Sequence, residues 1–427
     1  MSCNRSCGVI NMVNEKKAPE IRFDGFTEPW EHYTLGDVAT FSKGSGYSKA
    51  DLEKSGTPII LYGRLYTKYE NTIDEVDTFA TLKTNSVISQ GGEVIVPSSG
   101  ETAEDIARAS AVVQSGIILG GDLNIVKTNK LIDPVFLALT ISNGIPQREL
   151  SKKAQGKSVV HIRNSDLQVL DFTAPDKDEQ GTIADFFRNL DDTIALKKQQ
   201  YEQTVNIKKS MLEKMFPKKG ADVPEIRFEG FSGAWEENSL ESVTSNLVRG
   251  PFGGSLKKEM FVESGYRVYE QQDAIYGDKA NARYFINQSK YDELIRFAVS
   301  DGDFIVSCSG TIGRIYRLPN KTPKGVINQA LLKITADGKK LCPNYFLQYF
   351  RMDKFQQAII DDTQGGAMKN LVGMDKIRQV VIQMPKLDEQ IAIGDFFQNL
   401  DTLITTQLDE LEKLQNIKKA CLSKMFV

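Results

Sequence analysis

Two stretches of the sequence carry basic side chains and no acidic ones, next to loops rich in serine, glycine and glutamine. The first runs from Leu150 to Asn164 and the second from Phe304 to Ala336. Their basic residues are Lys152, Lys153, Lys157, His161 and Arg163 in the first, and Arg314, Arg317, Lys321, Lys324 and Lys333 in the second. Lysine and arginine neutralise phosphates, and glutamine, asparagine, serine and arginine can read base edges. The pattern suits a DNA duplex, although either stretch alone is equally typical of an ordinary solvated surface.

The candidate DNA contacts are cations, hydroxyls, amides and aromatic residues in short polar loops. In the first half of the chain they are Lys43, Ser45, Tyr62, Arg64, Ser98, Ser99, Gln155, Lys157, Ser158, His161 and Arg163. In the second half they are Arg249, Phe252, Gln271, Gln272, Ser307, Ser309, Thr311, Arg314, Gln364, Lys369 and Asn370. The clusters recur at comparable stages of the two halves, which favours a binding function over a solvated surface.

Residues that usually carry catalysis are sparse. The sequence has two histidines, His32 and His161, and neither has metal-ligand spacing. Gly156-Lys157-Ser158 resembles the end of a phosphate-binding loop, but Ser151 stands where that motif requires its first glycine. The G-x-S-x-G pattern and the Asn-Pro-Pro or Asp-Pro-Pro tetrapeptides of amino-methyltransferases are absent. We therefore expect a protein that binds without catalytic residues, a metal or a cofactor of its own.

The composition is that of a globular protein. A chain of 427 residues with 41% hydrophobic residues predicts two or three domains with proper cores. The net charge of −3 does not by itself indicate nucleic-acid binding, so that function must rest on local patches. Five cysteines without C-x-x-C spacing indicate neither a zinc site nor a disulfide framework, and they suit a reducing cytoplasm. No apolar run has membrane-spanning length, and residues 1–18 are predicted to be a disordered leader with Met12 as an alternative start.

The elements that must position these loops include a stretch that occurs twice. Pro175–Pro217 and Pro385–Val427 align without a gap and share DEQ, DFF, NLD, NIKK and KMF in the same register. Apolar residues recur in steps of three and four, which predicts one long amphipathic helix in each copy. Asp178 and Asp388 are candidate helix caps. A helix of about 36 residues is roughly 54 Å long and must bury its apolar stripe, so we expect the two copies to pair as a coiled coil. The alternative is that each helix packs on its own globular domain.

A second repeat precedes each variable region. Pro19–Ala39 and Pro224–Thr244 both begin PEIRF and contain the only two tryptophans, Trp30 and Trp235. We interpret these tryptophans and the PEIRF apolar residues as local core anchors. The chain therefore consists of two halves, each built as a PEIRF segment, a variable body and a long helix.

The two variable bodies, about Thr40–Thr173 and Ser245–Gln383, predict mixed α/β domains with glycine-rich loops. Gly92–Gly100 and Gly302–Gly310 each predict a short strand that ends in a small polar loop. Further strands are predicted at Asp122–Val126 and Ala330–Ile334, and short helices after Asp133-Pro134 and Cys342-Pro343. A constant scaffold that carries two divergent surfaces suggests two related but different targets.

The chain resembles the specificity subunits of type I restriction-modification systems over nearly everything after residue 18. The resemblance rests on Pro175 followed by Asp178-Glu179-Gln180, on Pro385 followed by Asp388-Glu389-Gln390, and on the long helices that end in Lys-Met-Phe. The PEIRF segments with their tryptophans and the order of body, helix, body, helix also match. The resemblance divides the chain into a leader (1–18), target-recognition domains (19–174 and 218–384) and helical spacers (175–217 and 385–427).

The resemblance implies functions that the residues alone do not give. Each target-recognition domain would read one half of a split, asymmetric DNA sequence, and the antiparallel helices would set the gap and dock two methyltransferase subunits. S-adenosylmethionine would be used by those partners to methylate adenine, and restriction subunits would use ATP with Mg²⁺ to cleave DNA at a distance. The alternatives are a single-chain DNA methyltransferase or nuclease, and a coiled-coil assembly scaffold with no nucleic-acid role.

One departure from a typical DNA-binding protein is the balance of charge. Pro19–Ala174 has 15 Lys and Arg against 20 Asp and Glu, and Glu225–Met374 has 19 against 18. Because neither domain is strongly basic, we predict that the isolated subunit holds DNA weakly and that partner subunits supply much of the phosphate contact.

Overall fold

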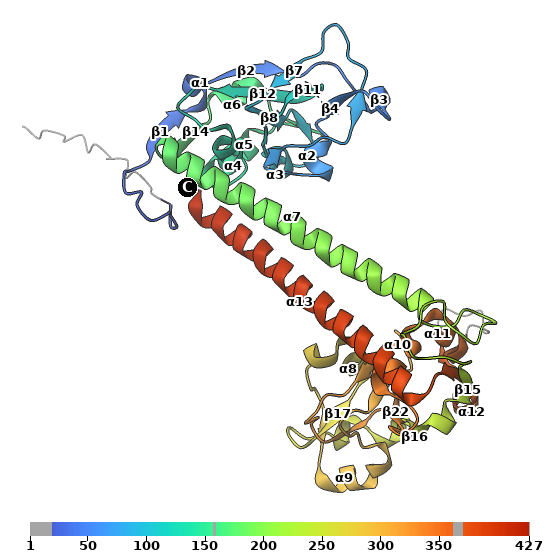
Figure 1. Cartoon of the computed structure of the whole chain (residues 1–427). Helices are drawn as coiled ribbons and strands as arrows, with labels where there is room; N and C mark the ends of the chain where they lie inside the picture. The colour runs from blue at the N-terminus through green and yellow to red at the C-terminus, as the bar shows by residue number, and fades with distance from the viewer. Residues whose placement is uncertain (1–18, 157–158, 362–369, 427) are drawn as a thin grey trace, which may run out of the picture. The chain divides into compact units, whose positions relative to one another are not determined.

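The computed structural model describes residues 19–156, 159–361 and 370–426. The chain forms two compact units, which are described separately. Unit 1 comprises Met1–Gln199 with Asp409–Val427, and unit 2 comprises Gln200–Leu408. The long helices α7 (Lys177–Lys214) and α13 (Leu387–Met425) therefore each contribute one end to each unit (Figure 1). These helices and the mixed α/β units confirm the predicted fold class.

Unit 1 contains two five-stranded sheets. In the first sheet the order is β2 (Ala39–Lys43), β12 (Leu123–Thr128), β8 (Glu93–Pro97), β10 (Ser110–Val112) and β5 (Thr72–Ile73). In the second it is β3 (Leu52–Glu53), β6 (Phe79–Ala80), β4 (Thr57–Ile60), β11 (Ser115–Leu119) and β7 (Ile88–Gln90). A short pair joins β9 (Ser99–Gly100) to β13 (Val160–His161). The predicted strands within 92–100 and 122–126 are thus confirmed as β8 and β12.

Unit 2 repeats the centre of this arrangement with fewer strands. One sheet has the order β16 (Thr244–Arg249), β22 (Leu331–Ala336), β19 (Phe304–Ser307) and β20 (Ile315–Arg317). The other has β18 (Phe285–Ile286), β17 (Tyr266–Tyr269) and β21 (Gly325–Ile327). A further pair joins β23 (Ile360–Asp361) to β24 (Asn370–Leu371). In both units the loop-bearing strand (β8 or β19) pairs with the same central strand (β12 or β22), so the equivalence predicted from sequence is confirmed.

Short helices complete each unit. Those of unit 1 are α1 (Leu35–Val38), α2 (Arg64–Thr67), α3 (Ala103–Ile106), α4 (Pro134–Ile141), α5 (Gly144–Lys153) and α6 (Asn164–Gln168). Those of unit 2 are α8 (Gln271–Tyr276), α9 (Gln288–Glu293), α10 (Pro343–Arg351), α11 (Asp353–Ile359) and α12 (Met374–Gln379). Both α4 and α10 begin with proline, as predicted, because a first-turn residue needs no backbone N–H partner.

The PEIRF segments enter each unit through a short antiparallel strand pair. In unit 1, β1 (Glu31–Thr34) pairs with β14 (Asp171–Ala174), and in unit 2, β15 (Glu236–Ser239) pairs with β25 (Val381–Met384). Beside these pairs Trp30 and Trp235 are only 2% and 3% exposed, which confirms them as core anchors.

An ion pair that the sequence reasoning missed explains why PEIRF and DEQ recur together. The guanidinium of Arg22 donates to both carboxylate oxygens of Glu179 at 2.7 and 2.6 Å, and Arg227 donates in the same way to Glu389. Both glutamates are buried, so each needs its arginine as a charge partner. The arginine of PEIRF thus fixes the start of the long helix in its own unit.

The glutamine of DEQ ties the long helix to the short helix beside it. Gln180 accepts the backbone N–H of Asp133 at 2.8 Å, and Gln390 accepts that of Cys342 at 2.9 Å. These two backbone N–H groups lie at the N-caps of α4 and α10, where helices leave donors unsatisfied. The DEQ motif is therefore structural in both copies.

The cap of the first long helix differs from the prediction. The backbone N–H of Glu179 donates to Asp176 Oδ1 at 2.9 Å, so Asp176 caps α7. Asp178 lies inside the first turn, and Asp388 likewise lies inside the first turn of α13. Their carboxylates still suit the positive end of the helix dipole.

Within each unit the ends of α7 and α13 run antiparallel. In unit 1, Asp191 pairs with Lys418 at 2.5 Å, and the later Lys197 pairs with the earlier Glu410 at 2.7 Å. In unit 2, Lys208 pairs with Asp401, which is the same contact between the NLD and NIKK motifs. The predicted antiparallel pairing of the two copies is thus present inside both units.

The KMF ends of the helices complete the cores. Phe426 lies in the core of unit 1 with its ring centroid 5.9 Å from Phe136 and 5.8 Å from Phe187. Phe216 lies in the core of unit 2, 5.9 Å from Trp235 and 5.9 Å from Phe397. The core of each unit therefore includes the end of the long helix that begins in the other half of the sequence.

Candidate nucleic-acid interface

In unit 1 several strands end at one edge, and the loops there carry most of the predicted contacts. Lys43 at the end of β2 is opposite Asn124, and Pro97 at the end of β8 is opposite Leu123. Ser45 then bridges to Gly120, just beyond the end of β11. The pairing brings loops that are up to about 80 residues apart in sequence to one edge, which we call edge 1.

Lys43 stands at edge 1 in a fixed position. A side chain at the next residue, Gly44, would overlap the carbonyl oxygen of Gly120, so only glycine fits there. Partial burial lowers the pKa of Lys43; Asp122 opposes this shift and Arg163 adds to it. The side chain of Asn164 donates to the carbonyl of Ser42 at 3.0 Å, which brings Arg163, from a separate stretch of the sequence, to the end of β2.

A second group at edge 1 forms around the β9–β13 pair. The hydroxyl of Ser99 lies 3.2 Å from His161 Nδ1, and the backbones of His161 and Gln155 exchange hydrogen bonds of 2.9 and 3.3 Å. The hydroxyl of Tyr66 donates to the carbonyl of Ser99 at 2.8 Å. Ser98 lies beside this group but is only 7% exposed, so its side chain has little access to a ligand.

Tyr62 extends this group and remains accessible. Its ring is 37% exposed and lies edge-on to Tyr66, with the centroids 6.3 Å apart. Arg108, which the sequence did not suggest, lies over the Tyr66 ring at 5.4 Å. The structure therefore brings together Tyr62, Ser99, Gln155 and His161, which lie in three separate stretches of the chain.

Arg64 does not fit the predicted role. Its side chain is buried, and it donates to Asp77 at 2.6 Å, to Glu70 at 2.9 Å and to the carbonyl of Glu75 at 2.9 Å. The two carboxylates neutralise its charge, and its Nε, which has no hydrogen-bond partner, is buried, so Arg64 has little to offer a phosphate. We correct the prediction for Arg64: it is a structural residue that holds the segments on either side of β5.

Ser45 also has an internal partner. Its hydroxyl accepts the backbone N–H of Val87 at 3.1 Å and donates to the carbonyl of Leu119 at 3.4 Å. These bonds hold the loop after β2 against β11 and leave the hydroxyl little capacity to read a base.

Unit 2 has an equivalent edge, which we call edge 2. Arg249 at the end of β16 is opposite Leu332, Ser307 at the end of β19 is opposite Leu331, and Tyr269 at the end of β17 is opposite Ile327. A side chain at Gly250 would overlap the carbonyl oxygen of Asn328, as at Gly44 in unit 1. The pair Arg249-Gly250 is thus the structural counterpart of Lys43-Gly44.

The loop after β19 is folded by Ser307. Its hydroxyl donates to the carbonyl of Thr311 at 2.5 Å and accepts the backbone N–H of Arg314 at 3.0 Å. Ser307 is fully buried, so the prediction that it contacts DNA is corrected: it shapes the loop. Its bonds leave Thr311 and the Arg314 side chain exposed.

Cys308 and Ser309 connect this loop to its neighbours. Burial raises the pKa of Cys308 to about 12, and the charge of Arg249 opposes that shift, so Arg249 lies near this loop. Ser309 lies 3.4 Å from Gln271, the first residue of α8. Edge 2 therefore joins Arg249, Gln271 and Ser309 in one surface.

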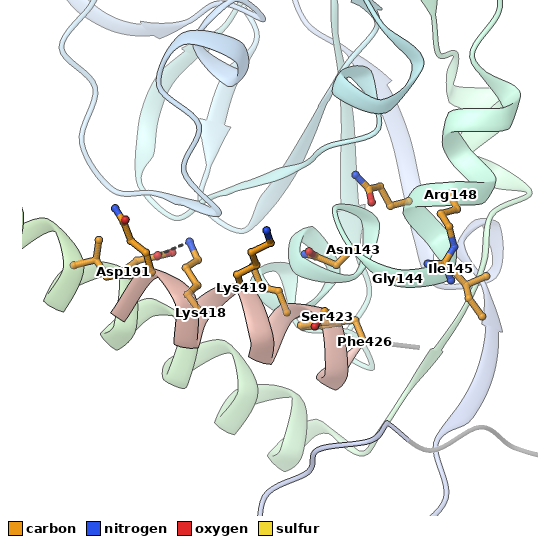
Figure 2. A pocket seen from close by; sticks show the side chains of 13 residues that line it. Asn143, Gly144, Ile145, Arg148, Asp191, Lys418, Lys419, Ser423 and Phe426 are labelled. Carbon is orange, nitrogen blue, oxygen red and sulfur yellow. Dashed lines mark ion pairs between the residues drawn. The ribbon is translucent and has the colours of Figure 1, made fainter. Parts of the chain in front are cut away.

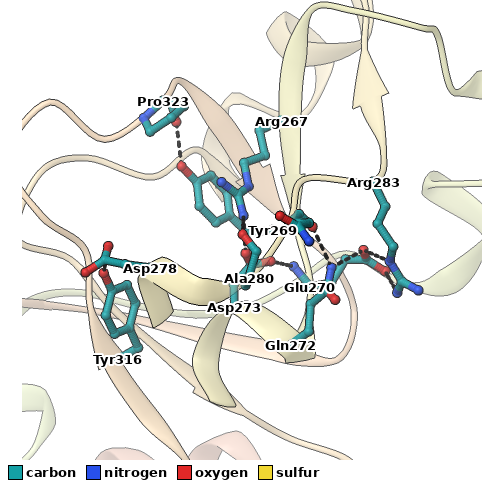
Figure 3. Close-up of polar contacts among 11 residues, drawn as sticks. Arg267, Tyr269, Glu270, Gln272, Asp273, Asp278, Ala280, Arg283, Tyr316 and Pro323 are labelled. Atoms are coloured by element: carbon teal, nitrogen blue, oxygen red, sulfur yellow. Dashed lines mark hydrogen bonds and ion pairs between the residues drawn. The ribbon is translucent and has the colours of Figure 1, made fainter. Parts of the chain in front are cut away.

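A polar network supports α8 at edge 2 (Figure 3). Arg267 pairs with Asp273 inside the unit, and Arg283 donates to both oxygens of Glu270 at 3.0 Å. Gln272 donates to the carbonyl of Asn281 at 2.9 Å, so its amide N–H is engaged within the unit. Of the two predicted glutamines, Gln271 is the better placed for a ligand.

Arg314 lies at the margin of edge 2. Burial lowers the pKa of Arg351, Asp401 opposes the shift, and the nearby charge of Arg314 adds to it. Arg351 also lies 3.9 Å from Asp401, whose carboxylate offsets its charge.

Four predicted contacts lie outside the described residues: Lys157, Ser158, Gln364 and Lys369. The backbone of Asn370 belongs to β24, which pairs Asp361 with Asn370. The predictions for these five positions remain untested.

Unit 1 also contains an open groove of about 760 Å³ beside the end of α13 (Figure 2). Asn143, Gly144, Ile145, Gln147 and Arg148 of α5 and its N-cap line one side, and the other is lined by Asp191, Ile194, Gln415, Lys418, Lys419, Leu422, Ser423 and Phe426. The groove combines an apolar floor with cations. In unit 2 the equivalent of Asp191 is Asp401. It accepts a hydrogen bond from the side chain of Gln348 at 2.9 Å and lies 3.9 Å from Arg351.

Two features are absent from the part of the chain that the structure describes. Among these residues no group of three or more His, Cys, Asp or Glu side chains is arranged to hold a metal ion. Within the same ranges, no helix combines the length and apolar character needed to span a bilayer.

Comparison with known proteins identifies the family. The model of the type I restriction modification DNA specificity domain matches residues 27–206 and again 258–418, which together make up most of the chain. The chain belongs to the family of type I restriction-modification specificity subunits. The two matches coincide with the two repeats, so both halves of this specificity subunit carry the family domain.

Individual relatives agree over the whole length. The type I restriction enzyme MjaVIII specificity subunit of Methanocaldococcus jannaschii is 20% identical and covers 96% of this chain and 95% of its own. The putative type I restriction enzyme MjaX specificity subunit of the same organism is 22% identical, with 96% of both chains covered. The crystal structure of the type I restriction-modification system S subunit from M. genitalium shares the fold, with a TM-score of 0.60, 14% identity, and coverage of 96% of this chain and 99% of that one.

Proposed function

We propose that this specificity subunit reads a bipartite, asymmetric DNA site, with unit 1 on one half-sequence and unit 2 on the other. The observation that supports the proposal is that the two units share the ion pairs that hold their long helices but differ in the side chains at their edges. Arg22 with Glu179 and Arg227 with Glu389 make the same contact in both units. The two edges keep the same geometry but differ in most of the side chains they present.

Each edge has groups for both parts of DNA recognition. Lys43 and Arg249 occupy matched positions beside glycines that no other residue can replace, and their charges suit phosphates. Ser99 with Gln155, and Ser309 with Gln271, supply hydroxyl and amide groups of the kind that read base edges. Phosphate contacts would position the duplex, and the differing polar groups would select the sequence.

The long helices are proposed to set the gap between the half-sequences. Helix α7 has 38 residues and α13 has 39, and an unbroken helix of that size is about 57 Å long. Such a length corresponds to about one and a half turns of DNA, at about 34–36 Å per turn. Inserting a heptad into both helices should therefore change the gap and leave both half-sequences unchanged.

The same helices are proposed to dock two methyltransferase subunits. The groove beside α13 in unit 1 supports this role because its apolar lining, with Ile194 and Leu422, adjoins the cations Arg148 and Lys419. That combination suits an amphipathic segment with acidic residues. In this arrangement adenine methylation, with its S-adenosylmethionine, belongs to the partners, and ATP and Mg²⁺ belong to restriction subunits. Such a complex would act on DNA in the cytoplasm, and the chain itself would be non-catalytic.

Mapping of methylated adenines tests the proposal. Cells that carry this subunit and its methyltransferase should methylate a split sequence, and exchange of Thr40–Thr173 for the body of a relative should change one half of it. If both halves changed, or if methylation showed no sequence dependence, the two-reader proposal would be wrong. Methyl transfer from labelled S-adenosylmethionine by the purified chain alone would support a single-chain enzyme instead.

A further inference from the structure

Phe252 in unit 2 is exposed to an unusual degree. Its side chain is 92% exposed, whereas the next most exposed large hydrophobic residue among those described, Tyr276, is 63% exposed. A nearly free phenyl ring gains nothing from the fold, since an apolar side chain stabilises a protein only when it is removed from water.

The loop that carries Phe252 is held on both sides. Before it, the backbone N–H of Gly250 donates to the carbonyl of Leu331 at 2.8 Å, and Pro251 is buried with its backbone restricted by the proline ring. After it, the backbone N–H of Ser255 donates to the carbonyl of Phe252 at 2.8 Å, and Leu256 is buried in a core cluster. Phe252 is therefore exposed on a turn whose two ends are fixed by hydrogen bonds and buried residues.

The loop leaves the sheet at edge 2, beside the groups proposed to contact DNA. Phe252 lies three residues after Arg249, which ends β16 and is exposed. The backbone N–H of Cys308 donates to the carbonyl of Ala330 at 2.8 Å, next to the Leu331 carbonyl that Gly250 uses, so Arg249 lies beside the loop that also carries Ser309 and Thr311. An apolar ring is thus placed next to a cation and to polar groups.

The equivalent loop of unit 1 is different. Its aromatic residue, Tyr47, is only 7% exposed, and its hydroxyl donates to the carbonyl of Thr81 at 3.1 Å and accepts the backbone N–H of Lys83 at 2.9 Å. Tyr47 lies nine residues before Gly56, and Leu256 lies nine residues before Gly265, the equivalent glycine in front of β17. The counterpart of Tyr47 in unit 2 is therefore the buried Leu256, and the shorter loop of unit 1 has no counterpart of Phe252. A requirement of the fold would apply to both units, so the exposed ring belongs to the divergent, target-dependent part of unit 2.

We propose that Phe252 is a wedge that enters the minor groove of the half-sequence read by unit 2 and separates one pair of stacked bases. Base pairs offer apolar faces that the ring can cover, and proteins that insert phenylalanine between base steps bend or unstack the duplex there. Arg249 would hold the adjacent phosphate. This inference rests on the proposed function of unit 2 as a DNA reader.

The test uses the full chain assembled with its methyltransferase subunits and DNA that contains 2-aminopurine, whose fluorescence rises on unstacking. Apart from the adenines that the methyltransferase subunits would flip out for methylation, the wild-type complex should brighten the probe at one step of the half-sequence read by unit 2 and at none in the other half. Phe252→Ala should abolish the signal and weaken binding by about tenfold to a hundredfold, because the ring is no longer buried against bases. Phe252→Trp should retain the signal.

Val381→Ala is the matched control. Val381 is 48% exposed in β25, which pairs with β15 at the start of the unit, away from the end of β16 that forms edge 2. Loss of a partly exposed apolar side chain there should leave both affinity and fluorescence unchanged.

Three results would overturn the wedge, and they separate it from the proposed function. Sequence-specific binding that Phe252→Ala leaves intact, with an unchanged probe signal, would refute the wedge alone. Failure of Phe252→Ala to assemble with the methyltransferase in the absence of DNA would show that the ring contacts a protein partner. Absence of sequence-dependent binding by the wild-type complex would refute the proposed function, and the wedge with it.

Discussion

Replacing Phe426 with alanine tests whether the end of the last helix is a structural part of unit 1. Residues just beyond the end of a helix usually contribute little to stability because helix ends fray. Here Phe426 is only 5% exposed and contacts Phe136 and Phe187 in the core. Removing it should therefore destabilise unit 1 far more than its position in the sequence suggests.

The expected magnitude follows from the contacts. Truncation of a buried phenylalanine to alanine typically costs about 3–5 kcal/mol, which combines the lost burial with the cavity left behind. Each aromatic pair adds about 0.5–1.5 kcal/mol to that burial. Because Phe426 lies just beyond α13, the backbone there can relax into the cavity more easily than within a helix or strand, so we expect the lower end of this range, about 3 kcal/mol.

Hydrogen exchange resolved by peptide is the appropriate assay because it separates the units. In Phe426→Ala, amides of α4 in unit 1 should exchange faster, by a factor that corresponds to about 3 kcal/mol, while β22 in unit 2 should be unaffected. Phe216→Ala should give the reverse pattern, because Phe216 lies in the core of unit 2. Leu403→Ala, at a residue of α13 that is 46% exposed, is the control and should cost less than about 0.5 kcal/mol. A loss below about 1 kcal/mol in Phe426→Ala, or equal effects in both units, would refute this view of the core.

Three further predictions concern the Arg22–Glu179 ion pair and edge 1. Arg22→Ala should destabilise unit 1 by about 3 kcal/mol in denaturant unfolding, since it leaves the carboxylate of Glu179 buried without a partner; Arg22→Ala with Glu179→Gln should recover part of that loss. Gly44→Ala should cost about 1–3 kcal/mol, whereas Gly63→Ala, where a Cβ has open space, should be nearly neutral; equal costs would contradict the steric argument. Lys43→Ala should lower the salt dependence of DNA binding by about one phosphate contact. Because burial lowers the pKa of Lys43, this lysine should lose its charge at a lower pH than an ordinary lysine, and DNA affinity should fall as the pH rises through that range. The affinity of the Lys43→Arg variant should not change over the same range.

Much of the fold could be predicted because local sequence patterns determine its helices and strands. The steps of three and four in Pro175–Pro217 gave a helix that the structure shows over 38 residues. Proline after Asp133 marked the start of α4, and the apolar run after Gly92 marked β8. These features depend on backbone preferences and periodicity, which neighbouring residues decide.

The candidate site was predicted less completely because charge in a sequence does not reveal a partner. Arg64 has the same chemistry as Arg249, yet Asp77 and Glu70 neutralise the first, while the second ends a strand with its side chain exposed. Ser307 and Ser309 differ in the same way: the first bonds within its own loop and the second lies at the surface. No spacing rule distinguishes the members of either pair.

The sequence by itself determined that the chain is duplicated, that each half carries a long helix, and that the halves differ in their variable bodies. Tertiary structure decided which residues meet. Arg22 and Glu179 are 157 residues apart, and Phe426 reaches the core that holds Phe136, because strand pairing and helix packing bring together distant parts of the chain. The repeated motifs could be recognised in the sequence, but the reason they recur is contact between them, and contact is a property of the folded chain.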